Sequence, residues 1–150
     1  MFQDNYFLTT IDQYAFYNLK DYVEIFETLN TNLSDNEIIF SILKQFQNLR
    51  RVSMHNDQIT MIPNYAFNHR NLTDIWFGLE NRRTYQPIVN IGQYAFYNLP
   101  NLKFLRIFSS NLTYINKYSF AQRNRTITNT MLFIYLGSSL LNSSRSLLNT

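Results

Sequence analysis

The string Gln-Tyr-Ala-Phe-Tyr-Asn-Leu occurs twice in this chain, at residues 13–19 and 93–99. Two looser copies lie at residues 65–67 and 118–120, and a weaker unit without the string fills the gap between the first two. An isoleucine marks each unit, and successive isoleucines lie 23–29 residues apart: Ile11, Ile39, Ile62, Ile91 and Ile115. This period is close to that of short-coil repeat proteins and shorter than that of ankyrin or helical-pair arrays. The chain is therefore predicted to be a solenoid in which each coil packs on its neighbours.

The apolar spacing changes within one unit. Ile91, Ala95 and Leu99 recur at every fourth residue, as on one face of a helical turn. Leu105 and Ile107 then alternate with outward residues, as in a strand. Each coil is thus expected to contain a short strand, a turn and a loose helical return. Phe16, Phe67, Phe96 and Phe120 of the repeated strings are expected to stack as a buried spine in the return segments.

The spacing Leu102-x-x-Leu105-x-Ile107-x-x-Ser110-x-Leu112-x-x-Ile115-x-x-x-x-Phe120 resembles the leucine-rich repeat typical of animal extracellular proteins. Other units are read in the same register: Leu49, Val52, Met54, Asp57, Ile59 and Ile62; Leu72, Ile75 and Phe77; Tyr22, Ile25 and Asn30; Leu132 and Ile134. The fit is weakest over residues 31–44 and after residue 121. The sequence of residues 98–107, with Ser-Ser-Asn at residues 109–111, resembles the repeat sequences of the ectodomains of glycoprotein-hormone-type receptors.

The resemblance implies an α/β repeat solenoid. Its fold would be a leucine-rich-repeat horseshoe of about five repeats, with a parallel sheet on the concave side and short helical or irregular segments on the convex side. We expect residues 1–150 to form a single domain that is a fragment of a longer array. The family usually has Asn after the strand, whereas this chain has Asn30, Asp57, Glu80 and Ser110 there, which indicates an irregular array.

The concave face is the predicted binding surface, because outward strand residues vary while inward ones repeat. Its candidate protein-binding residues are Glu24, Phe26, Arg51, Ser53, His55, Asp74, Trp76, Phe104, Arg106 and Phe108. Charges of alternating sign and a patch of aromatics with Arg are typical of protein interfaces. The alternative is that these residues bind no partner. The charges would then form a solvated row, and the aromatic residues would be present only because they favour strand formation. The expected partner is a protein or peptide ligand.

Composition argues against other classes of function. A net charge of +3 with 15% charged residues is not the basic surplus of a nucleic-acid binder. The chain has no Cys, its two histidines lack metal-ligand spacing, and three glycines form no phosphate loop. We therefore expect no catalysis, no cofactor and no metal site.

The cellular setting stays open at this stage. A receptor-like or adhesion ectodomain would be extracellular, a structural or adhesive surface array is a second reading, and a cytosolic adaptor would be cytoplasmic if the chain is complete. Five Asn-x-Ser/Thr sequons are candidate glycosylation sites: Asn32, Asn71, Asn111, Asn124 and Asn142. The most apolar segment, residues 131–141, is too short to cross a bilayer, so no direct membrane insertion is expected. Both terminal units lack polar caps, which predicts self-association.

Overall fold

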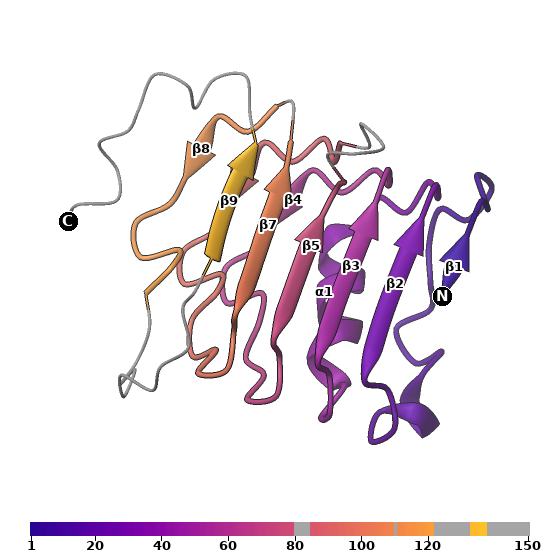
Figure 1. Cartoon of the computed structure of the whole chain (residues 1–150). Helices are drawn as coiled ribbons and strands as arrows, with labels where there is room; N and C mark the ends of the chain where they lie inside the picture. Colours follow the sequence, from indigo (N-terminus) through magenta and orange to yellow (C-terminus); the bar gives the residue numbers. More distant parts are fainter. Residues whose placement is uncertain (80–84, 110, 122–132, 138–150) are drawn as a thin grey trace.

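The computed structural model describes residues 1–79, 85–109, 111–121 and 133–137, with the side chains of residues 133, 134 and 137 left aside. The chain winds as a solenoid with one long parallel sheet on one wall (Figure 1). In spatial order, the strands of this sheet are β1 (Phe2–Gln3), β2 (Ile25–Leu29), β3 (Arg51–His55), β5 (Asp74–Phe77), β7 (Phe104–Phe108) and β9 (Phe133–Gly137). The predicted repeat solenoid is confirmed, and β1 adds a strand that the repeat pattern did not predict.

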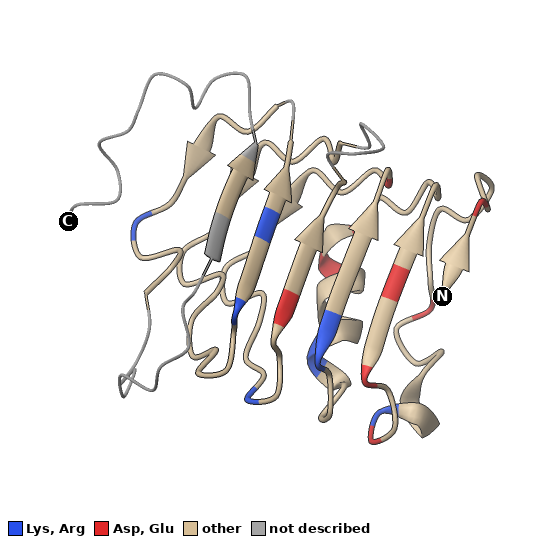
Figure 2. Cartoon of the chain, viewed as in Figure 1, with Lys and Arg blue, Asp and Glu red and all other residues tan. Residues whose placement is uncertain are grey.

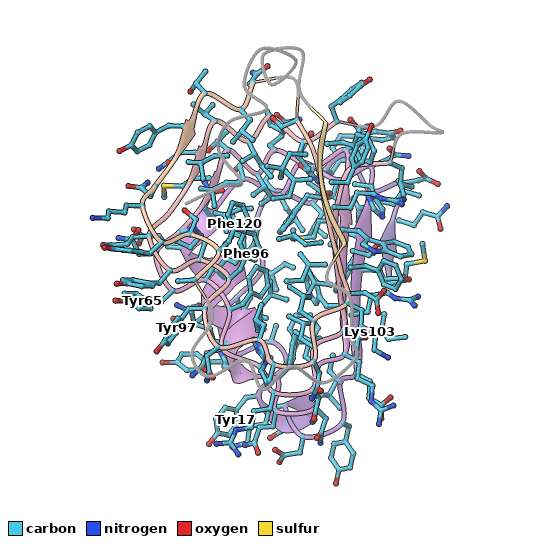
Figure 3. The ribbon with its side chains drawn as sticks, turned by 60° about the vertical axis from the view of Figure 1, so that its left-hand side comes forward. Tyr17, Tyr65, Phe96, Tyr97, Lys103 and Phe120 are labelled. Carbon is cyan, nitrogen blue, oxygen red and sulfur yellow. The ribbon has the colours of Figure 1, made fainter. Side chains whose placement is uncertain are left out.

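The opposite wall carries a smaller parallel sheet, formed by β4 (Met61–Ile62), β6 (Asn90–Ile91) and β8 (Tyr114–Ile115). A short 3-10 helix, η1 (Tyr17–Leu19), and one α-helix, α1 (Asn36–Gln45), complete the described elements. Figure 3 shows the two walls with a layer of side chains between them. Alternate residues of the long strands fill this layer, and each of the following is at most 1% exposed: Val52, Met54, Ile75, Phe77, Leu105 and Ile107. Burial of these apolar side chains is the main force that closes each coil.

The repeated aromatic strings form the return segments of the second wall. Phe67, Phe96 and Phe120 stack in one row, with ring centroids 5.7 and 5.4 Å apart, so the predicted spine is confirmed for these three. Figure 3 shows Phe96 and Phe120 inside the wall and Tyr65 and Tyr97 outside it. Phe16 instead contacts Phe2, Phe26 and Phe46, in a separate aromatic cluster at the first coils.

A second aromatic row lies on the outside of the same wall. Tyr65, Tyr94 and Tyr118 have φ values of 50°, 54° and 62°, in the left-handed region that side chains other than glycine rarely adopt. Their rings stack at 5.2 and 5.4 Å from one coil to the next. The left-handed residue turns the tyrosine outward while the following small residue and phenylalanine point into the core. Stacking between coils offsets part of the cost of this backbone conformation.

Helix α1 replaces the aromatic string in the unit whose sequence fits the repeat least well. The Asp35 side chain accepts a hydrogen bond from the Ile38 amide at 3.0 Å and so caps the helix N-terminus. The buried face of the helix consists of Ile39, Phe40, Ile42 and Leu43. Phe40 packs edge-on against Phe67 at 5.6 Å, which joins the helix to the phenylalanine row.

The predicted register of the first unit is wrong by one residue. Strand β2 pairs with β3 so that Ile25 faces Arg51 and Phe26 faces Val52. Tyr22 and Ile25, predicted to point inward, are 78% and 53% exposed, and the inward positions belong to Val23, Phe26 and Thr28. A one-residue slip moves every side chain of a strand to the opposite face. The cause is Thr28, a polar residue in an inward position that the apolar pattern did not recognise.

The second position after β2 and after β3 carries a polar connection between coils. Thr31, and not the predicted Asn30, occupies it in the first unit, and the Thr31 hydroxyl donates to Asp57 at 2.5 Å. Gln86 extends the row on the other side, because its amide donates to Asp57 at 3.1 Å. Glu80 and Ser110, the other predicted members, lie outside the described residues.

Candidate functional site

We call the outward surface of the long sheet the sheet face; it corresponds to the predicted concave face. Its side chains come from alternate positions of β2, β3, β5, β7 and β9. They are Ile25, Glu27, Leu29, Arg51, Ser53, His55, Asp74, Trp76, Phe104, Arg106, Phe108 and Tyr135. Eight of the ten predicted binding residues lie on this face, those on β3, β5 and β7. Across β2, β3, β5 and β7 acidic and basic positions alternate (Figure 2).

Glu24 and Phe26 do not belong to the sheet face, so their prediction as part of it is wrong. Glu24 precedes β2, and its carboxylate lies 3.6 Å from the Arg50 guanidinium in an exposed ion pair. Phe26 is 5% exposed and packs against Phe16 and Phe46. Both errors follow from the one-residue register shift of the first unit.

Trp76 is the centre of the sheet face. The Arg51 guanidinium carbon lies 5.1 Å from the centroid of its ring, and that of Arg106 lies 5.8 Å away. The two arginines come from β3 and β7, the strands on either side of β5, so they approach the indole from opposite sides. Cation–π contacts of this kind contribute about 0.5–1 kcal/mol each at exposed sites and hold both guanidinium groups in place.

Aromatic side chains extend this cluster across β7 and β9. Arg106 also lies 5.9 Å from the Phe108 ring, and Phe108 packs against Tyr135 at 4.9 Å. Phe104 and Tyr135 are 44% and 47% exposed, whereas Phe108 is 3% exposed beneath its neighbours. We call Trp76, Phe104, Arg106, Phe108 and Tyr135 the aromatic–arginine cluster. It presents exposed aromatic area around a fixed positive charge.

A small pocket of about 190 Å³ lies beside Trp76, over β2 and β3. Glu27, Ser53 and His55 line it, together with Met1 and Leu79. Ser53 Oγ lies 2.6 Å from His55 Nε2, and both side chains are buried. The pair fixes the floor of the pocket, so Ser53 and His55 offer little contact area to a partner.

Sequence reasoning missed three members of the sheet face, Ile25, Glu27 and Leu29, and did not include the outward Tyr135 among the candidate binding residues. The first three were assigned to the wrong side by the shifted register of β2. The signal that identifies them is the alignment of Val23-x-x-Phe26-x-Thr28-x-x-Thr31-x-Leu33 with Leu49-x-x-Val52-x-Met54-x-x-Asp57-x-Ile59. Tyr135 lies opposite Arg106 in the register of β7 with β9.

The comparison with known families agrees with this geometry. A family model described as a BspA-type leucine-rich repeat region matches the chain in six copies, over residues 2–127 and 78–149. The chain belongs to the BspA-type leucine-rich repeat family. No curated protein and no solved structure shows a significant match to it.

Membership of the BspA-type family indicates a protein-binding repeat module, since leucine-rich repeats generally mediate protein interactions and are typically not catalytic. Within the described residues, no group of three or more His, Asp or Glu side chains is placed to hold a metal ion. No helix in that part of the chain combines the length and apolar character needed to span a membrane.

Two of the described sequons lie at turns or bends of this BspA-type array. Asn71 is exposed before β5, and Asn111 is exposed after β7. Asn32 is half-buried, and its side-chain amide donates to the carbonyl oxygen of Tyr6. Asn124 and Asn142 lie outside the described residues. Asn71 and Asn111 are therefore the two described sequons whose side chains are exposed.

Proposed function

We propose that this chain is a non-catalytic recognition module that binds a protein or peptide on the sheet face. The observation that carries this proposal is the aromatic–arginine cluster, with Phe104 and Tyr135 nearly half exposed beside Arg106. Aromatic and arginine side chains contribute most of the binding energy at protein interfaces. A sheet with buried apolar residues behind it holds them rigidly, so little conformational entropy is lost on binding.

For the setting, we propose a receptor-like or adhesion ectodomain, with the module exposed at the cell surface. The exposed sequons Asn71 and Asn111 support this setting, because the secretory pathway glycosylates accessible sites of this kind. Genomic sequence on both sides of the chain tests it. A signal peptide upstream and an apolar span downstream would support an ectodomain, whereas stop codons on both sides would favour a cytosolic adaptor.

A structural or adhesive array is the second candidate. The row of stacked Tyr65, Tyr94 and Tyr118 supports it, since these rings join successive coils on the outer surface, as the phenylalanine row does in the core. Such an array would space other domains and would use no defined site on the sheet face. The two candidates therefore differ in whether one surface binds selectively.

The binding experiment starts from a random peptide library displayed on phage and selected on the immobilised chain. Affinities of the selected peptides are then measured for the parent, Trp76→Ala and Phe104→Ala. Tyr114→Ala is the matched control, because Tyr114 is an aromatic residue of β8 on the opposite wall and is 59% exposed. We expect the two sheet-face variants to weaken binding tenfold or more, about 1.4 kcal/mol, with unchanged circular dichroism.

Two results would count against the proposal. One is a set of selected peptides whose affinity is the same for the parent and for Trp76→Ala. The other is an equal loss for Tyr114→Ala, which would place the binding surface on the opposite wall or spread it over the whole array.

A further inference from the structure

The sheet face carries two guanidinium groups that lack an anionic partner in the described part of the chain. Arg51 lies opposite Asp74 in the register of β3 with β5, yet its guanidinium leans over Trp76 and forms no ion pair there. Its Nε atom is buried and has no hydrogen-bond partner. Burying a charged donor without a partner is unfavourable. Arg51 as a whole is only partly buried, so its guanidinium can pair with a carboxylate supplied by a ligand.

The carboxylates of the same face are placed differently. Asp74 accepts a hydrogen bond from the Thr73 hydroxyl at 2.6 Å, so part of its acceptor capacity is used. Glu27 lies on β2, beyond Ser53 from Trp76. Arg106, by contrast, is exposed and has aromatic rings as its neighbours. The strip from Trp76 to Tyr135 is therefore positive and aromatic.

We propose that the sheet face binds an acidic peptide segment in an extended conformation, whose carboxylate side chains pair with Arg106 and Arg51 on the two sides of Trp76. This inference rests on the proposed function and names its ligand class. Arginine forms two parallel hydrogen bonds with a carboxylate, and a guanidinium already held by an aromatic ring loses little freedom in doing so. Alternate side chains of an extended peptide lie on one side, about 7 Å apart, and so present successive carboxylates to the same face.

The chain supplies its own reporter for the test, because Trp76 is its single tryptophan. The probes are end-blocked octapeptides with Glu, Gln or Lys at alternate positions and Ala between them. Blocked ends exclude binding through a terminal carboxylate, and a Gln peptide with a free C-terminus tests that source separately. We expect a saturable change in Trp76 fluorescence with the Glu peptide only. The affinity should fall as NaCl is raised, because screening weakens exposed charge pairs.

Substitutions of Arg51 and Arg106 test the site, and the neighbouring Arg50 provides a matched control. Arg106→Gln and Arg51→Gln should each weaken binding of the Glu peptide at least tenfold, and Arg106→Lys should lose less than Arg106→Gln. Arg50→Gln is the control: Arg50 carries the same charge one residue before Arg51, but pairs with Glu24 away from the sheet face. Circular dichroism of each variant should match that of the parent.

Several outcomes would overturn the inference. Equal binding of the Glu and Gln peptides would show that charge does not select the ligand. An equal loss for Arg50→Gln and Arg106→Gln would indicate a diffuse charge effect. Tighter binding of a thymidine octanucleotide, abolished by the same variants, would assign the site to a nucleic acid. If the phage-selected peptides bind the sheet face but are neutral or basic, the proposed function stands and this inference fails.

Discussion

At the scale of single residues, Asp57 ties three successive coils together. Its carboxylate accepts hydrogen bonds from the Thr28 and Thr31 hydroxyls at 2.7 and 2.5 Å, and from the Gln86 amide at 3.1 Å. Burial raises the pKa of Asp57 above its ordinary value of 3.8, and the hydrogen bonds only partly oppose this effect. Asp57 thus forms the hydrogen bonds between coils that an asparagine usually forms in the family.

Asp57→Asn should therefore change how stability depends on pH. Because the folded pKa is raised, the folded state binds more protons than the unfolded state at pH values above 3.8. The contribution of Asp57 to stability is thus present at low pH and is lost as the pH rises through the folded value. The amide introduced by the substitution would keep hydrogen bonds to both threonines, and it would offer a donor to Gln86 Oε1, which lacks a partner.

The measurement is urea unfolding of the parent and the variant between pH 4 and pH 7. We expect the stability of Asp57→Asn relative to the parent to increase as the pH rises. A difference that stays constant over this range would show that Asp57 has the same pKa in the folded and unfolded states.

At the scale of elements, helix α1 is held by a histidine from the next coil. His69 Nε2 lies 2.9 Å from the Leu43 carbonyl oxygen, and His69 Nδ1 accepts a hydrogen bond from the Asn68 amide at 3.3 Å. Both bonds are made by the neutral ring with its proton on Nε2. Burial is the main cause that lowers the pKa of His69 below 6.5. The neutral ring is therefore part of how the helix docks.

The contribution of His69 should fall as the solution is acidified below pH 6.5, opposite in direction to that of Asp57. In this range the unfolded state binds more protons than the folded state, so stability decreases with decreasing pH. His69→Gln removes the titration and keeps an amide donor for Leu43. It should cost about 1 kcal/mol at neutral pH, as for one weakened hydrogen bond. Urea unfolding at pH 7.5 and 5.5 checks both points: equal stability of parent and variant at pH 7.5 would contradict the cost of the weakened hydrogen bond, and an equal loss for both on acidification would contradict the pH dependence.

At the scale of the whole molecule, the open edge of the long sheet favours association. No described strand pairs with the outer edge of β1. Phe7 and Met1, close to this edge in sequence, are 96% and 74% exposed. Unpaired strand edges beside apolar side chains are templates for pairing with another chain. The outer edge of β1 is thus expected to be a contact point between chains.

Light scattering over a range of concentrations tests this expectation. The parent should show an average mass that increases with concentration, and the double variant Gln3→Lys/Phe7→Lys should remain a monomer, since charge at the edge opposes pairing. Tyr114→Lys, on the opposite wall, is the control and should behave as the parent does. A parent that stays monomeric at every concentration would show that the ends do not self-associate.

The repeat pattern predicted the solenoid and strands β3, β5 and β7, because their inward residues are uniformly apolar. It failed at β2 because Thr28 points inward, and its partner Asp57 lies 29 residues away in the sequence. It did not predict β1, which has two residues and no repeat around it. The orientation of Arg51 was not predictable either: Asp74 and Trp76 both lie within its reach, and only packing decides between them.

The smaller sheet of β4, β6 and β8 sets the geometry of longer arrays of such coils. In the coils of β3, β5 and β7 strands are hydrogen-bonded on both walls, so these coils should be separated by nearly the same distance on each side. Stacked coils of equal thickness add up to a rod, with about 4.8 Å gained per coil. The number of coils would then determine the length of the rod. A partner would contact a long, flat surface on which binding positions repeat at a fixed interval.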